Sequence, residues 1–173
     1  MKTILRFRTL LFLGGLLSVL FFLGTYLLEY GFGLEPCPLC YLQRGLLFII
    51  SLVFCLGVLQ NCKQRGRLVC GRLVYCAILF VCSVLGGALA SRQLWLQYIS
   101  PIHESNCFAG FEKMLELMPL WEVLKETLQG SQECSQIDFT FLGLPLSAWS
   151  LFSFMGLGMY VLILCYLQIK RRI

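Results

Sequence analysis

Long apolar runs alternate with shorter polar connections along this chain. A helix rises about 1.5 Å per residue, so roughly 20 mostly apolar residues cross a hydrocarbon layer about 30 Å thick. Runs of that length lie at about 9–28, 41–59, 73–90 and 145–167. Lipid offers no hydrogen-bond partners to backbone N–H and C=O groups, so each run is predicted to be a helix. The expected fold is an all-α membrane protein, a four-transmembrane-helix bundle forming one integral membrane domain over residues 1–173.

The composition agrees with this pattern. Hydrophobic residues make up 58% of the 173 residues and charged residues 13%, and the mean hydropathy is +0.80, so the chain is far more apolar than a soluble domain of average composition. The first run ends Tyr26-Leu-Leu-Glu29 and lacks a small-x-small cleavage pattern. It is therefore expected to stay in the protein as a span and not to be removed as a signal peptide.

The charges of the connecting segments predict the orientation. Cations without any acid occupy the amino-terminal segment, the loop at about 60–72 and the carboxyl-terminal tail, whereas the segments at about 29–40 and 91–144 carry the acids. By the positive-inside rule, both termini and the 60–72 loop are cytoplasmic, and the other two loops face the periplasm. The net charge of +5 therefore reflects membrane topology, and a nucleic-acid partner is not expected.

This topology sorts the ten cysteines. Lasting disulfides form outside the reducing cytoplasm, and four cysteines lie on the outer side: Cys37 and Cys40 in the first loop, Cys107 and Cys134 in the second. The other six are interpreted as packing or bystander residues, within spans (Cys55, Cys76, Cys82, Cys165) or on the cytoplasmic loop (Cys62, Cys70).

The stretch "EPCPLCYLQR" at residues 35–44 carries the chemistry. In a Cys-x-x-Cys pair, one thiol can attack while its neighbour resolves the mixed disulfide. Cys40 stands just before the second span, near the positive end of a helix dipole, and Arg44 follows one turn later on the same face. Both features favour the thiolate of Cys40.

Other interpretations of this stretch stay open at this point. The pair could be half of a zinc site. Such a site would need a second pair of ligands, but no further Cys-x-x-Cys pair is present and the single histidine, His103, lies in the other outer loop. The pair could instead be a structural clip. Arg44 could extend to the membrane interface without any role in chemistry.

The second outer loop contains "FEKMLELMPLWEVLKETL" at residues 111–128, in which apolar residues recur at helical spacing. This pattern predicts an amphipathic helix on the membrane surface, with Trp121 at headgroup depth and a bend or break at Pro119. The alternative is an ordinary loop helix that covers the bundle. Cys107 and Cys134 bracket the segment, and their spacing does not decide between a structural and an exchangeable disulfide.

Taken together, these motifs resemble the DsbB family of bacterial inner-membrane disulfide-generating enzymes. The resemblance rests on four spans, Cys-x-x-Cys followed by Arg at the second span, and a Cys-bracketed second outer loop. It extends to "LWLQYISP", "MPLWEVLKETLQGSQEC" and "DFTFLGLPLSAW". It implies a quinone-dependent protein-disulfide oxidoreductase that re-oxidises a periplasmic DsbA-like thioredoxin-fold oxidase and passes the electrons to membrane ubiquinone or menaquinone, with neither metal nor haem.

The resemblance also assigns roles to residues. The reduced partner would attack Cys107, and the released Cys134 would engage Cys37 and leave Cys40 as a thiolate facing the quinone. Arg44 would bind a quinone oxygen. Further hydrogen bonds to the quinone are expected from Gln93 and Gln97, just beyond the third span, and Arg92 lies beside them. Better-known relatives have a histidine near the position of Gln93.

Two other functions fit part of the sequence. An oxidoreductase of the vitamin K epoxide reductase type also has four helices and paired cysteines, but its Cys-x-x-Cys follows the loop pair, the reverse of the order here. A non-enzymatic four-span scaffold would explain Cys107 and Cys134 as a structural disulfide. It would leave Cys37, Cys40 and Arg44 without a role.

Overall fold

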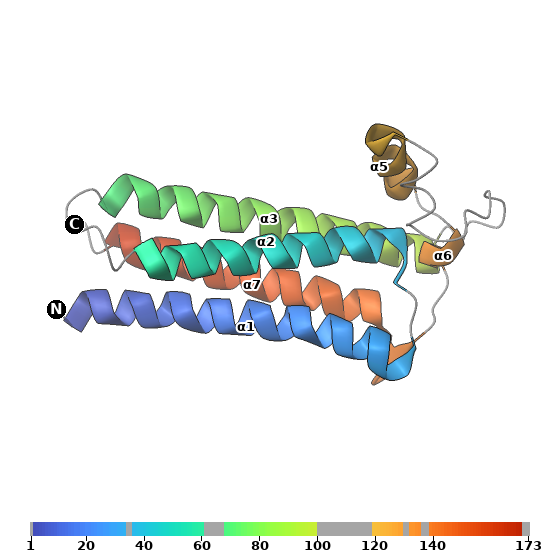
Figure 1. Cartoon of the computed structure of the whole chain (residues 1–173), viewed down its shortest axis with the longest axis horizontal. Coiled ribbons are helices and arrows are strands. Elements are labelled where there is room, and N and C mark those ends of the chain that lie inside the picture. Colours follow the sequence, from blue (N-terminus) through green and yellow to red (C-terminus); the bar gives the residue numbers. More distant parts are fainter. Residues whose placement is uncertain are drawn as a thin grey trace.

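Four long helices form an up-down-up-down bundle in the computed structural model, which describes residues 2–33, 36–60, 68–99, 119–129, 132–135 and 139–170. Both termini lie at one end (Figure 1). We call the opposite end, where α1 and α3 finish, the thiol end. Every long helix contains an apolar stretch that can cross a membrane, which confirms the predicted four-helix fold. The helices are α1 (Lys2–Phe32), α2 (Pro38–Gln60), α3 (Leu68–Tyr98) and α7 (Leu146–Lys170).

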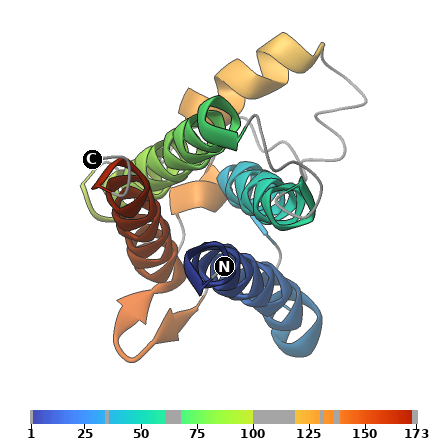
Figure 2. The same ribbon diagram turned by 90° about the vertical axis from the view of Figure 1, so that its left-hand side faces the viewer.

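The helices pack in the order α1, α2, α3, α7, and the ring closes only loosely (Figure 2). The contacts between α3 and α7, α1 and α2, and α2 and α3 are extensive, whereas α1 and α7 touch at few points. The main core contains buried Phe54, Phe154 and Leu157. Many large apolar side chains on the outer face are exposed, as expected for a surface that meets lipid.

Small residues let the helices approach closely. A Cβ atom on Gly86 of α3 would lie 2.2 Å from Cε1 of Phe154 on α7. A Cβ atom on Gly14 of α1 would lie 2.8 Å from ring carbons of Phe54 and Tyr160. Close contacts at small residues are a usual source of packing energy between membrane helices. The glycines in these apolar runs therefore fit the bulky aromatic side chains of the core.

The helices at the thiol end extend beyond the apolar runs that predicted them. Between Ala90 and Tyr98 the sequence has neither proline nor glycine, so nothing interrupts α3 at the membrane edge. Gln93 and Gln97, expected just beyond the third span, therefore lie on the last turns of α3. Cys40, expected just before the second span, lies within α2.

At the opposite end of the bundle, α3 also begins earlier than predicted. Cys70, expected on the cytoplasmic loop, therefore lies within its first turn.

The remaining elements are short and gather at the thiol end (Figure 1). They are α5 (Leu120–Gln129), α6 (Gln132–Ser135) and a hairpin of β1 (Thr140–Phe141) and β2 (Leu144–Pro145). The hairpin, which the sequence pattern did not suggest, turns through Leu142 and Gly143, both with positive φ. This is the backbone that two-residue hairpins require.

Helix α5 begins directly after Pro119, whose carbonyl accepts the backbone N–H groups of Glu122 and Val123. The break expected at this proline is therefore the start of a helix. Leu120 and Trp121 are exposed, whereas Val123 is buried. The location of this helix on the membrane surface stays a prediction, and residues 111–118 lie outside the described part of the chain.

Candidate active site at the thiol end

The first turn of α2 brings the two thiols of the Cys-x-x-Cys motif together. Pro38 occupies the first helical position, where a missing N–H costs nothing, and the carbonyl of Cys37 accepts the backbone N–H groups of Cys40 and Tyr41. One turn of helix thus separates the two cysteines. Their sulfur atoms lie 2.9 Å apart. Two thiols in such contact are positioned for disulfide chemistry.

A third cysteine joins this pair from a distant part of the sequence. Cys134 on α6 is completely buried and packs in a small cluster with Cys37, Leu39 and Leu96. A hydrogen bond with Cys134, a second one with Cys40 and burial together raise the pKa of the Cys37 thiol well above its usual value. Cys37 is therefore held as a neutral thiol between two other cysteines.

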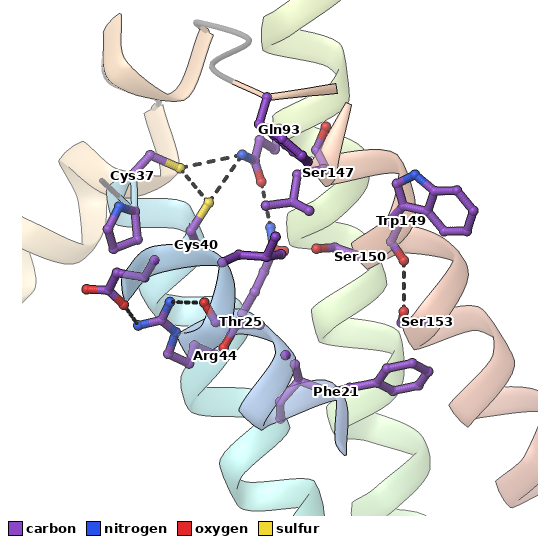
Figure 3. Close-up of a pocket in the computed structure, with 18 of the residues that line it drawn as sticks. Phe21, Thr25, Cys37, Cys40, Arg44, Gln93, Ser147, Trp149, Ser150 and Ser153 are labelled. Carbon is purple, nitrogen blue, oxygen red and sulfur yellow. Dashed lines mark hydrogen bonds and ion pairs between the residues drawn. The ribbon is translucent and has the colours of Figure 1, made fainter. Parts of the chain in front are cut away.

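Two buried glutamines complete the surroundings of the sulfurs. Gln93 Nε2 on α3 lies 3.4 Å from Cys40 Sγ and 3.5 Å from Cys37 Sγ. Figure 3 shows the Gln93 amide pointing at both sulfur atoms. The Oε1 atom of Gln93 accepts a hydrogen bond of 2.9 Å from Gln43 Nε2 on α2. Gln93, which was expected to bind the quinone, thus directs its amide at the cysteine sulfurs.

Arg44 lies one turn beyond Cys40 and is held from several sides. Its Nη1 forms an ion pair of 2.6 Å with Glu29 Oε2, and its Nη2 lies 3.4 Å from the Thr25 carbonyl oxygen. Its guanidinium also stacks 4.4 Å from the ring centre of Tyr26. The Arg44 and Glu29 side chains are only 11% and 21% exposed. A charge that is paired and stacked in this way is fixed in position, unlike a cation that extends freely to the interface.

These residues form one wall of a pocket of about 520 Å³. The pocket lies where α1 and α7 have few contacts, and it reaches the outer face of the bundle beside the exposed side chains of Leu20 and Leu27. Its lining is part apolar and part polar. The polar lining is supplied by all four long helices and includes Cys40, Gln43, Arg44, Glu29, Gln93 and Ser147.

The other predicted site residues have different places. Gln97 also lines the pocket, and it accepts a hydrogen bond from Ser147 on α7. Arg92 is exposed on α3. Cys107 and His103 lie outside the described residues. Within the described residues, no group of three His, Cys, Asp or Glu side chains could hold a metal ion.

Two residues of the site were not singled out by the sequence. Glu29 was assigned to a loop because the apolar run ends before it, yet α1 continues to Phe32 and carries Glu29 to Arg44. Gln43 lies three residues after Cys40, which places both on one face of α2. A signal for Gln43 was available, because it is a polar residue within an apolar span, and such residues usually face the interior of a bundle or a cavity.

Comparison with known proteins identifies the family. The sequence profile described as "Disulfide bond formation protein DsbB" matches residues 7–164. Proteins named "Disulfide bond formation protein B" are similar over most of their length. The one from Chromohalobacter salexigens is 39% identical over 160 residues, 91% of each chain. The one from Hahella chejuensis is 39% identical over 150 residues, 87% of this chain and 85% of its own.

The chain belongs to the DsbB family. A third relative, "Disulfide bond formation protein B 1" of Pseudomonas aeruginosa, is 34% identical over 86% of this chain and 88% of its own. Membership in the DsbB family, with four helices able to span a membrane, makes the protein a multi-pass membrane oxidoreductase that forms disulfide bonds. The resemblance drawn from the sequence is thereby confirmed. The scaffold alternative is excluded.

Proposed function

We propose that this protein re-oxidises a DsbA-like thioredoxin-fold dithiol oxidase and transfers the electrons to a membrane quinone. One observation carries the proposal: Cys37 and Cys40 of the three-cysteine cluster line the same pocket as Arg44, and this pocket reaches the outer face of the bundle. Cys37 and Cys134 are buried, so the partner would exchange with Cys107 and not with the cluster itself. A lipid-soluble acceptor can approach the same sulfurs from the lipid.

The protein side of the reaction follows from the contact between Cys37 and Cys134. When the partner's thiolate attacks a disulfide between Cys107 and Cys134, the partner becomes bonded to Cys107 and Cys134 leaves as a thiolate. Cys134 then attacks the sulfur of Cys37 in the Cys37–Cys40 disulfide. A Cys134–Cys37 bond forms, the Cys37–Cys40 bond breaks, and Cys40 keeps the electron pair as a thiolate. The partner's second thiol then displaces Cys107, and the partner leaves as a disulfide. Cys107 re-forms its bond with Cys134 and releases Cys37, so that Cys37 and Cys40 hold the two electrons as a dithiol.

The other side of the relay is assigned to the pocket, whose residues fit a quinone. Apolar side chains of α1 and α7 suit a substituted ring and the start of its tail, and the guanidinium of Arg44 offers N–H donors for a ring oxygen. Cys40 and Arg44 would hold the ring, and Gln97 in the same lining could add a hydrogen bond. Re-formation of the Cys37–Cys40 disulfide would supply the two electrons and two protons that convert a bound ubiquinone or menaquinone to its quinol.

The arrangement also supports a location. A disulfide-forming site needs an oxidising compartment, so the thiol end is assigned to the periplasmic side of the bacterial inner membrane. The cation-rich termini and the 60–72 loop then lie in the cytoplasm, as the positive-inside rule requires.

The test is quinone-dependent oxidation of a reduced DsbA-like protein by the purified enzyme in detergent. Quinone should be consumed only when the reduced partner is present. Each of the substitutions Cys37→Ser, Cys40→Ser, Cys107→Ser and Cys134→Ser should abolish turnover, with Cys55→Ser as the matched control on the outer face of α2. Full turnover by the Cys40→Ser variant would refute the proposed mechanism.

A further inference from the structure

A pair of glutamine side chains connects α2 to α3 directly behind the redox cysteines. Gln43 and Gln93 are only 4% and 6% exposed. Burying an amide costs several kcal/mol unless its polar atoms are hydrogen-bonded. Gln43 Nε2 meets that requirement for Gln93 Oε1 at 2.9 Å. The two amides are therefore a linked unit and not two separate polar residues.

This link fixes which way the Gln93 amide faces. An amide side chain has a carbonyl oxygen that accepts and an NH₂ group that donates. Because the N–H of Gln43 is directed at the oxygen of Gln93, the NH₂ group of Gln93 is left facing Cys37 and Cys40, at 3.5 and 3.4 Å. With Gln43 oriented as it is, the reverse orientation of Gln93 would place two N–H groups against each other and turn an oxygen toward the sulfurs.

The direction matters at one step of the chemistry. When the Cys37–Cys40 disulfide opens by attack on Cys37, the electron pair of the broken bond remains on Cys40 as a thiolate. A thiolate can only accept hydrogen bonds, and hydrogen bonds to charged groups are stronger than those between neutral groups. The NH₂ group of Gln93 is directed at the atom on which this charge develops.

We propose that Gln43 is a positioning residue that acts through Gln93: it holds the Gln93 NH₂ group toward the cysteine sulfurs and so favours opening of their disulfide. An amide does not titrate in the physiological range, so this donor neither gains nor loses a proton while the thiols do. The inference rests on the proposed function only in taking Cys37 and Cys40 as the pair that exchanges.

The test is the equilibrium between the dithiol and disulfide forms of Cys37–Cys40 in buffers of defined thiol/disulfide ratio, without quinone or partner protein. Methionine resembles glutamine in length and has no N–H. Gln93→Met should shift the equilibrium about tenfold toward the disulfide, which corresponds to about 30 mV for a two-electron couple. Gln43→Met should shift it in the same direction, because the Gln93 amide is then free to turn.

The double variant identifies the route of the effect. If Gln43 acts through Gln93, adding Gln43→Met to Gln93→Met should produce no further shift in the equilibrium. Ser51→Ala is the matched control, since it removes a hydrogen bond between α1 and α2 that is remote from the sulfurs. It should leave the equilibrium of the cysteine pair unchanged.

A second substitution covers the case in which a methionine variant fails to fold. In Gln43→Glu, the carboxylate accepts and cannot donate, so it should draw the Gln93 NH₂ group away from the sulfurs and also shift the equilibrium toward the disulfide. The inference would be overturned if both Gln43 variants had the same equilibrium as wild type. It would also be overturned if Gln43→Met shifted the equilibrium equally in the wild-type and Gln93→Met backgrounds. The dithiol–disulfide equilibrium is measured without quinone. A protein that does not use quinone would therefore still give these results, so failure of the proposed function can be told apart from failure of this inference.

Discussion

Two pairs of neighbouring cysteines lie near opposite ends of the same bundle, in contrasting surroundings. At the thiol end, Cys37 and Cys40 contact Cys134, receive hydrogen bonds from Gln93 and border a pocket. Near the other end, Cys76 of α3 packs beside Cys165 of α7. That second pair lies in the apolar main core with Leu79, Val161 and Leu164.

The difference shows what turns neighbouring thiols into a reaction site. Both pairs bring cysteine side chains together, so proximity does not distinguish them. Among the described residues, the pair at the thiol end has a third cysteine beside it, an amide donor at its sulfur atoms and a neighbouring pocket. The Cys76–Cys165 pair is thus interpreted as core packing, where thiols behave as small apolar groups.

The largest expected effect separates the two pairs directly. Replacement of Cys37 by alanine should remove all turnover, because the relay then has no sulfur between Cys134 and Cys40. Replacement of Cys165 by alanine should leave the turnover number within about twofold of wild type. Both variants are assayed by oxidation of a reduced DsbA-like protein with excess quinone. Strong loss of turnover in the Cys165 variant would break the comparison.

The next effect concerns Arg44, which is assigned to the quinone pocket. Arg44→Ala should raise the Michaelis constant for quinone by about 10- to 100-fold, since a hydrogen bond to a charged group contributes about 1.5–3 kcal/mol. The Michaelis constant for the protein partner should stay nearly unchanged. Steady-state kinetics with each substrate varied in turn measures this split. Equal changes in both constants would place Arg44 outside the quinone site.

A smaller effect is expected from the close packing of α3 against α7, which supports the whole bundle. In Gly86→Ala the added methyl group would collide with the buried ring of Phe154, so the variant should lose about 1–3 kcal/mol of stability. Gly87→Ala is the matched control, because its nearest side-chain atom lies at an ordinary 3.9 Å. Thermal unfolding in detergent compares the two. A Gly86 variant as stable as its neighbour would contradict the close packing of α3 on α7.

The smallest effect is a shift in the pH dependence of the rate at which Cys37 is alkylated. Because hydrogen bonding and burial raise the pKa of Cys37, the fully reduced protein should show slow alkylation of Cys37 at neutral pH, and the rate should rise as the pH increases past the ordinary thiol range. Cys134→Ala removes the largest cause, so the rate profile should move to lower pH. Mass spectrometry of the peptide that contains Cys37 follows the reaction. An unmoved profile would show that Cys134 does not interact with Cys37 in solution.

The sequence predicted the helices well, and the structure brings three of the four predicted cysteines together, both for physical reasons. Apolar runs of spanning length have few alternatives in lipid, and the spacing of Cys37, Cys40 and Arg44 acts within one helix. Contacts between helices were harder to predict. The approach of Gln43 to Gln93 and of Glu29 to Arg44 depends on how three helices pack, and a single sequence contains no direct signal of that packing. The hairpin around Leu142 was also missed, because its strands have only two residues each.

The central claim is that electrons pass through the cysteines of the thiol end and through no other pair in the bundle. The most direct measurement is differential alkylation with mass spectrometry, first after excess reduced partner is added without quinone and then after quinone is supplied. Cys37 and Cys40 should become alkylated as free thiols in the first sample and protected as a disulfide in the second, whereas Cys76 and Cys165 should be free thiols in both. The claim would be contradicted if Cys37 and Cys40 kept one state throughout, or if Cys76 and Cys165 changed state with the quinone.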